Sequence, residues 1–198
     1  ERQRKEFGVR SLDKSRSIIM GMKSFPMNTE VRHILTYSAS TPPANSNTNT
    51  LSMEMNQSLV LLPKVPMTPR IYDERVGFFS VSQIDYGLDE QKATARRYIT
   101  KWRLEPKDEA AYLRGELVEP IKQIVYYIDP ATPEKWRKYL KQGVEDWQKA
   151  FEAAGFKNAI IAKDAPTKEE DPDWSAEDVR YSVIRYTANP IQNAMGPH

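Results

Sequence analysis

The sequence contains no cysteine among its 198 residues. Disulfide frameworks, cysteine-ligated zinc sites, iron–sulfur clusters and thiol nucleophiles are therefore excluded. Long hydrophobic runs are missing as well. The longest aliphatic run, Leu59 to Leu62, is far shorter than the ~20 residues that a membrane-spanning helix needs. The chain is therefore predicted not to span a membrane.

Histidine and glycine are scarce too. The two histidines, His33 and His198, are far apart in the sequence, and neither belongs to a His-Glu-x-x-His motif. The eight glycines are scattered, so the chain has neither a glycine-rich phosphate loop nor a Gly-x-Ser-x-Gly nucleophile elbow. His33 is predicted to be a structural histidine on a strand. No residue of the chain is assigned a catalytic or metal-binding role.

Charge of one sign is not in excess either. The sequence has 29 Lys and Arg against 27 Asp and Glu, which gives a formal net charge of +2. A protein that binds nucleic acid usually concentrates surplus Lys and Arg on one face, so no nucleic-acid partner is expected. Hydrophobic residues make up 39% of the chain, which is sufficient for a packed core.

Residues 1–105 are predicted to form a β-rich domain. Val31 to Tyr37 alternates between apolar and other residues, as a strand with one buried, apolar face does. Ser38 to Thr50 is nearly free of large apolar residues and is predicted to be a hairpin loop. Leu51 to Leu62 resumes an extended pattern, and Arg97 to Leu104 is predicted to be the last strand of this domain.

Residues 106–119 are charged and are predicted to be a linker that contains a short helix. From residue 120 to 198 the pattern is that of a second, partial domain. Ile121 to Ile128 is rich in β-branched and aromatic residues, which predicts a buried strand. Thr132, as N-cap before Pro133, predicts the start of a long helix.

An apolar stripe continues this helix until a glycine ends it; its members are Trp136, Leu140, Val144, Trp147, Phe151 and Ala154. Ala159 to Ala162 is a second strand, so the segment predicts a β-α-β unit with parallel strands. Thr167 to Asp178 is acidic, and a solvated loop is favoured over a calcium site because the spacing of an EF-hand loop is absent. Val179 to Thr187 is predicted to be a third strand. The fold class is therefore α+β: a β-rich domain, then a mixed sheet with one long backing helix.

Short strings in collinear order carry a family resemblance. Downstream they are Tyr126-Tyr127-Ile128-Asp129, Thr132-Pro133-Glu134-Lys135-Trp136, Gly143-Val144-Glu145-Asp146-Trp147 and Ala194-Met195-Gly196-Pro197. These strings resemble the peptidase region of large bacterial zinc-dependent metalloproteases of the Bacteroides type, which is zincin-like. Upstream they are Asp73-Glu74-Arg75-Val76-Gly77-Phe78-Phe79 and Tyr98-Ile99-Thr100-Lys101-Trp102. These resemble the domain of unknown function that precedes that peptidase region.

The resemblance implies an exported protease whose zinc-binding His-Glu-x-x-His helix lies beyond the last residue given. Zinc is expected in the full-length parent and not in this fragment, which is expected to be inactive alone. The implied partners are a peptide or protein substrate and the remainder of the peptidase domain. The role of residues 1–105, accessory or inhibitory, stays open.

By the same resemblance, the strand nearest the missing active-site helix forms one wall of the substrate cleft. Its candidate substrate-binding residues are Tyr181, Ser182, Val183, Ile184, Arg185 and Tyr186. The alternative for these residues is that they belong to the sheet core. The alternative function is a non-catalytic binding or assembly module, in which the exposed sheet edge recruits a partner strand.

Overall fold

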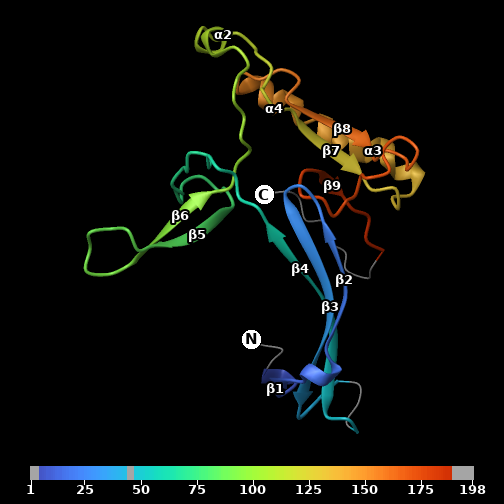
Figure 1. The fold of residues 1–198 in the computed structure, drawn as a ribbon. Helices are drawn as coiled ribbons and strands as arrows, with labels where there is room; N and C mark the ends of the chain where they lie inside the picture. Colours follow the sequence, from blue (N-terminus) through green and yellow to red (C-terminus); the bar gives the residue numbers. More distant parts are fainter. Residues whose placement is uncertain (1–4, 44–46, 189–198) are drawn as a thin grey trace. The chain divides into compact units, whose positions relative to one another are not determined.

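The computed structural model describes residues 5–43 and 47–188 (Figure 1). The strands are β1 (Val9–Leu12), β2 (Ile18–Ser24), β3 (Asn28–Ala39), β4 (Thr50–Val60), β5 (Ser80–Asp85), β6 (Thr94–Ile99), β7 (Ile124–Ile128), β8 (Ile160–Asp164) and β9 (Ser182–Ile184). The helices are the 3-10 turn η1 (Lys14–Arg16), α2 (Glu109–Leu113), α3 (Glu134–Glu145) and α4 (Gln148–Ala153). The protein is therefore a mixed α+β protein in which strands predominate, as the sequence predicts.

The chain divides into two compact units, and each unit is made of two separate stretches of the sequence. The first unit consists of Glu1–Leu62 and Thr167–Tyr181, and the second consists of Pro63–Pro166 and Ser182–His198. The acidic segment 167–181 therefore belongs with the amino-terminal strands, although it follows β8 in the sequence. The predicted borders at residues 105 and 120 both lie inside the second unit.

The first unit is built on one antiparallel sheet. The central strand is β3, which pairs with β1, β2 and β4. The turn between β2 and β3 is closed by the Phe25 N–H, which donates to the Asn28 carbonyl at 2.7 Å. The predicted strand around Val31 and the strand after the Ser38–Thr50 region are both confirmed as long partners in this sheet.

The buried face of β3 is not the predicted one. Val31, His33 and Leu35 are only half-buried, and their cross-strand neighbours Met22 and Met55 are exposed. On the opposite face, polar side chains are buried: Asn28, Glu30 and Thr36 are 5%, 9% and 3% exposed. Segment 167–181 bonds to this polar face at Asn28, and η1 bonds to it at Thr36. A period-2 pattern shows alternation but not what covers each face.

Two strands of the second unit, β5 and β6, form an antiparallel ribbon (Figure 1). The sequence did not predict β5, and β6 ends at Ile99, so the predicted strand Arg97–Leu104 is wrong beyond that residue. Leu104 packs instead against the core of the second unit. The Trp102 ring meets the Tyr126 ring edge-on, with centroids 5.9 Å apart.

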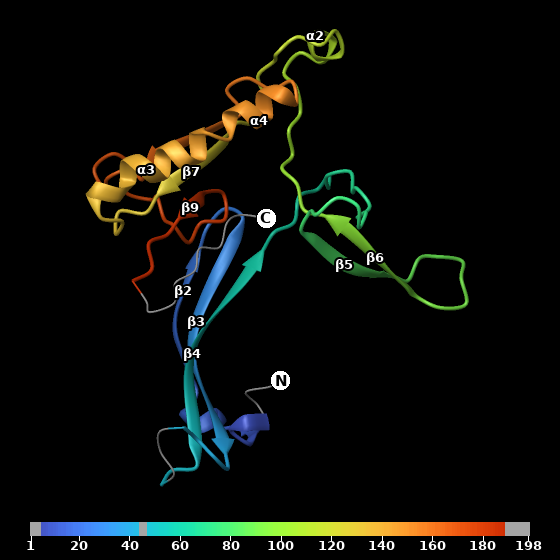
Figure 2. The ribbon, with the colours of Figure 1, turned by 180° about the vertical axis from the view of Figure 1, so that it is seen from behind.

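The other sheet of the second unit has the order β8-β7-β9. Both pairings are parallel, so the described part of the sheet is parallel and not mixed as predicted. The β7–α3–β8 segment is the predicted β-α-β unit. Ile124, Tyr126 and Ile128 on one face of β7 are buried, and Val144 and Phe151 of the helical region pack against Ile124 and Tyr126. Figure 2 shows α3 and α4 lying along β7.

The predicted long helix is two helices. The Trp147 N–H donates to the Val144 carbonyl, three residues back, at 3.3 Å, and this interrupts the α-helical ladder between α3 and α4. Trp136 and Trp147, which belong to the predicted apolar stripe, are 48% and 63% exposed and lie outside the core. Pro133, not Thr132, occupies the N-cap position of α3.

The short helix predicted within residues 106–119 is confirmed as α2. The Asp108 carboxylate caps it by accepting from the Ala111 N–H at 2.9 Å. Ala111 and Val118 are buried with Phe156 and Ala159, so this stretch contributes to the core of the second unit.

Of the helices in residues 5–43 and 47–188, none has the length and apolar character that crossing a membrane requires.

Candidate functional site

The outer strand β9 contains the core of the predicted substrate wall. β9 pairs with β7 over three residues, with Ser182 opposite Tyr126 and Ile184 opposite Ile128. The Ile184 carbonyl accepts from the Asp129 N–H at 3.0 Å, so the backbone groups of Ile184 face β7. Because successive residues of a strand face opposite sides, the N–H and C=O of Val183 point away from β7. Within the described residues no strand pairs with that side.

The six predicted site residues divide into three kinds. Ile184 packs against the core cluster of Ile124, Tyr126 and Ile160, so its side chain is structural. Ser182 and Val183 are half-buried members of β9. The remaining three lie outside the strand: Tyr181, which belongs to the first unit, and the exposed Arg185 and Tyr186. The predicted strand Val179–Thr187 is therefore shortened to its middle.

Tyr126 on β7 carries an isolated polar atom in the core beside β9. Its side chain is 6% exposed, and its hydroxyl has no hydrogen-bond partner among the residues that the structure describes. Burial raises the pKa of Tyr126 to about 12. A phenol in this state neither ionises near neutral pH nor serves as an acid or base, so Tyr126 acts as a packing residue.

Replacing Tyr126 by phenylalanine is expected to leave the free energy of unfolding unchanged or to raise it by up to ~1 kcal/mol. The reason is that the substitution removes a buried hydroxyl that pays for its desolvation with no hydrogen bond. Urea unfolding of the purified chain measures this. The matched control is Tyr112→Phe, which removes the hydroxyl that donates to the Ala154 carbonyl at 3.2 Å and is expected to cost ~1 kcal/mol. A loss above 1 kcal/mol for Tyr126→Phe would contradict the assignment.

A second feature is a polar hollow along α3 and the end of β8. Its lining is charged with both signs and consists of Glu134, Arg137, Lys138, Lys141, Gln142, Glu145, Asp146 and Asp164. Most of the cationic groups are already engaged. Arg137 donates to the Thr132 and Pro130 carbonyls, and Lys141 pairs with Asp164. The Lys141–Asp164 pair therefore connects α3 to the end of β8.

The described residues contain no group of three histidine, aspartate or glutamate side chains arranged to hold a metal ion. His33 lies half-buried on β3, opposite Ile19 and Met55. His198 lies outside the described residues. The acidic segment uses its carboxylates for pairing: Glu177 pairs with Lys23 and Arg32, and Asp178 pairs with Arg180.

The amino-terminal half of the chain matches a known family. Residues 1–107 match the family described as a domain of unknown function, DUF5117. The chain belongs to the DUF5117 family. The DUF5117 match ends two residues beyond the border at residue 105 that the sequence predicts. Comparison with curated proteins and with solved structures gave no match.

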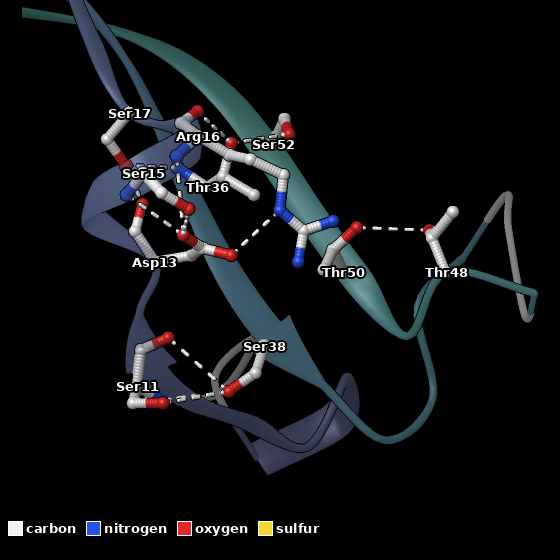
Figure 3. Close-up of polar contacts among 10 residues, drawn as sticks. All are labelled: Ser11, Asp13, Ser15, Arg16, Ser17, Thr36, Ser38, Thr48, Thr50 and Ser52. Carbon is white, nitrogen blue, oxygen red and sulfur yellow. Dashed lines mark hydrogen bonds and ion pairs between the residues drawn. The ribbon is translucent and has the colours of Figure 1, made fainter.

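The sheet formed by β1, β2, β3 and β4 lies within the matched residues and is called the DUF5117 sheet below. One end of it carries a polar network centred on Asp13 (Figure 3). The Asp13 carboxylate accepts from the Ser15 hydroxyl at 2.6 Å and from the Arg16 Nε at 2.7 Å. These two hydrogen bonds lower the pKa of Asp13 to about 2. The Thr36 hydroxyl donates to the Arg16 carbonyl at 2.8 Å, which ties η1 to β3. The network is satisfied by its own members and fixes the turn between β1 and β2.

The other end of the DUF5117 sheet has a buried carboxylate. Glu30 Oε2 accepts from the Asn56 amide and from the Ser58 hydroxyl of β4, each at 2.6 Å. Glu30 Oε1 accepts from the Asn28 amide at 2.6 Å. Hydrogen bonds from Ser58, Asn56 and Asn28 hold the pKa of Glu30 below its usual value. The sequence analysis missed this cluster, although polar residues at every second position (28, 30, 32 and 56, 58) were its visible signal.

Proposed function

We propose that this chain is the amino-terminal portion of an exported zinc metallopeptidase, and that β9 forms one wall of its peptide-binding cleft. One observation carries the proposal: β9 is the outer strand of the β8-β7-β9 sheet, with the backbone of Val183 directed away from β7. The collinear strings that resemble those of zinc-dependent metalloproteases, with a domain of unknown function ahead of them, support the proposal.

The wall acts through its backbone. An extended peptide beside β9 accepts a hydrogen bond from the Val183 N–H and donates one to the Val183 carbonyl, as in other cases of strand addition. Backbone pairing holds peptides of many sequences in one direction and register. Ile184 contributes by packing on the core, which keeps β9 against β7.

The described residues do not fit a zinc site, so no catalytic step is assigned to them. Zinc bound in the parent would supply an activated water and would polarise the scissile carbonyl. The proposal therefore requires the residues that bind zinc to be encoded downstream of residue 198. Reading the coding sequence beyond residue 198 tests this: a His-Glu-x-x-His motif on an amphipathic helix is expected. A parent without paired histidine ligands would instead favour a binding module that recruits a partner strand.

Replacing Val183 by proline in the parent peptidase is expected to lower kcat/KM for peptide cleavage about fivefold, since one backbone donor to the substrate is worth ~1 kcal/mol. The ladder to β7 keeps its donors, because only outward-facing groups are lost. The measurement is steady-state cleavage of a fluorogenic peptide.

Two variants frame this result. Val183→Ala trims the side chain and keeps the N–H, so kcat/KM is expected to stay within about threefold of the parent value. Ile184→Pro removes a donor that faces β7 and is expected to unfold β9. Equal activities of the Val183→Pro and Val183→Ala variants would argue against the wall.

A further inference from the structure

Segment 167–181 returns to the DUF5117 sheet and is held there by side chains from β2 and β3. Asn28 makes the central contacts. Its Nδ2 donates to the Glu177 carbonyl at 2.8 Å, and its Oδ1 accepts from the Val179 N–H at 3.0 Å. An amide that bonds the carbonyl of one residue and the N–H two residues later fixes the backbone between them as a neighbouring strand would.

Asn28, together with Lys23 and Arg32, is called the clamp below. The clamp holds the side chain of Glu177 as well as the backbone. Lys23 Nζ of β2 lies 2.6 Å from Glu177 Oε2, and Arg32 Nη2 of β3 lies 3.2 Å from Glu177 Oε1. Both cations are more than half exposed, so these pairs contribute little energy and mainly select for an acidic residue at this position.

Asn28 is itself held from behind. Its side chain is buried, and the same Nδ2 that reaches Glu177 also donates to Glu30 Oε1 at 2.6 Å. Glu30 in turn is held by Asn56 and Ser58 of β4. The clamp is therefore built by three strands of the DUF5117 sheet, because Lys23 lies on β2, Asn28 on β3 and the residues that hold Glu30 on β4.

Contacts among its own residues also order segment 167–181. The Asp178 carboxylate is fully buried and accepts from Arg180 Nη2 at 2.6 Å, and this guanidinium holds the pKa of Asp178 below its usual value. The Trp174 and Tyr181 rings lie 5.8 Å apart. Only two residues separate Val179 from Ser182, where β9 begins.

From this geometry we infer that the DUF5117 sheet is an intramolecular docking site for segment 175–181, and that Asn28 anchors the backbone that runs directly into β9. The coupling to substrate rests on the proposed function, whereas the docking does not. On this inference residues 1–62 form an integral part of the folded protein rather than a removable prosegment.

Hydrogen exchange of the 198-residue chain tests the docking directly. In the Asn28→Ala variant, the Val179 amide loses its acceptor, and its protection is expected to fall 10- to 100-fold. Asn56→Ala is the matched control, because Asn56 bonds the same Glu30 carboxylate but does not touch the segment. Its Val179 protection is expected to stay within about threefold of the unmodified chain. An equal fall in both variants, or no fall in Asn28→Ala, would overturn the docking.

Asn28→Asp gives a second readout, which a merely destabilised sheet would not produce. This variant places a carboxylate against Glu30 Oε1 and the Glu177 carbonyl, where two acceptors repel. Neighbouring carboxylates take up one shared proton at a higher pH than an isolated carboxyl does. Protection of Val179 in this variant is therefore expected to rise as the pH falls from 7 to 5.

In the unmodified chain the protection is expected to stay flat over the same range, because the pKa of Glu30 is held below its usual value and the carboxylate therefore stays ionised. The other charged groups near this point, Lys23 of β2, Arg32 of β3, Glu54 of β4 and Glu177, are the same in both chains. Parallel pH profiles for the two chains would count against the clamp.

The coupling is tested in the parent peptidase. Asn28→Ala is expected to raise KM for a peptide three- to tenfold with kcat nearly unchanged, because the variant loosens the approach to β9 and leaves the chemistry intact. If the parent cleaves no peptide while the exchange results hold, the docking stands and the proposed function fails. If cleavage occurs and neither KM nor exchange responds to Asn28→Ala, the docking fails and the proposed function stands.

Discussion

Replacing Ile128 by alanine is expected to lower the free energy of unfolding of the second unit by about 3–4 kcal/mol. Ile128 is 1% exposed and ends β7, the central strand of the β8-β7-β9 sheet. It pairs with Asp164 on one side and with Ile184 on the other. Removing its three outer carbons takes away buried apolar surface and leaves a cavity that two strands border, and such sites cost about 2–5 kcal/mol.

Urea unfolding followed by tryptophan fluorescence measures this loss, because Trp102, Trp136 and Trp147 all belong to the second unit. Ile121→Ala is the matched control: the same atoms are removed from a side chain that is 63% exposed. This control is expected to change stability by less than about 0.5 kcal/mol. Similar small effects for both variants would mean that β7 is not the centre of this unit.

Replacing Gly155 by alanine is expected to cost about 3 kcal/mol. Gly155 has a φ of +92°, and an added Cβ would lie 2.6 Å from Cε2 of the Tyr112 ring. The ring has little freedom to retreat, since it packs on Phe156 with centroids 5.1 Å apart and its hydroxyl bonds the Ala154 carbonyl. Backbone strain of roughly 1 kcal/mol therefore adds to a steric cost of about 1–3 kcal/mol.

Two other glycines separate these causes. Gly115 has a φ of +83° but no atom within 4 Å of an added Cβ, so Gly115→Ala is expected to cost only about 1 kcal/mol. Gly143 lies inside α3 with equally open surroundings, and Gly143→Ala is expected to stabilise the protein by about 0.5–1 kcal/mol. The order of the three midpoints in urea unfolding checks the argument. A Gly155→Ala variant no less stable than Gly115→Ala would show that Tyr112 moves freely.

Local chemistry in the sequence predicted several elements well. The dense β-branched and aromatic run before Asp129 is β7, and the glycine that was expected to end the helical region follows α4 with a positive φ. The helix start was displaced by one residue, to Pro133, and the single helix became two. These differences concern single hydrogen bonds, which a pattern of apolar residues does not resolve.

The candidate site was predicted in part. The resemblance directed attention to residues 181–186, and three of them form β9. Which backbone groups of β9 face outward depends on the Asp129–Ile184 hydrogen bond. That bond selects Val183 rather than its neighbours, and the sequence holds no signal for this choice because all three residues fit a strand equally well.

The sequence by itself determined the α+β class, the β-α-β unit and the absence of cysteine chemistry, because these depend on composition and on short-range periodicity. Only the tertiary structure decided which face of β3 is buried and where segment 167–181 lies. The Asn28–Glu177 contact joins residues 149 positions apart. Alternation along a strand distinguishes its two faces, but whether a face is buried depends on what packs against it. Here the packing segment, residues 167–181, lies between β8 and β9 in the sequence, far from β3.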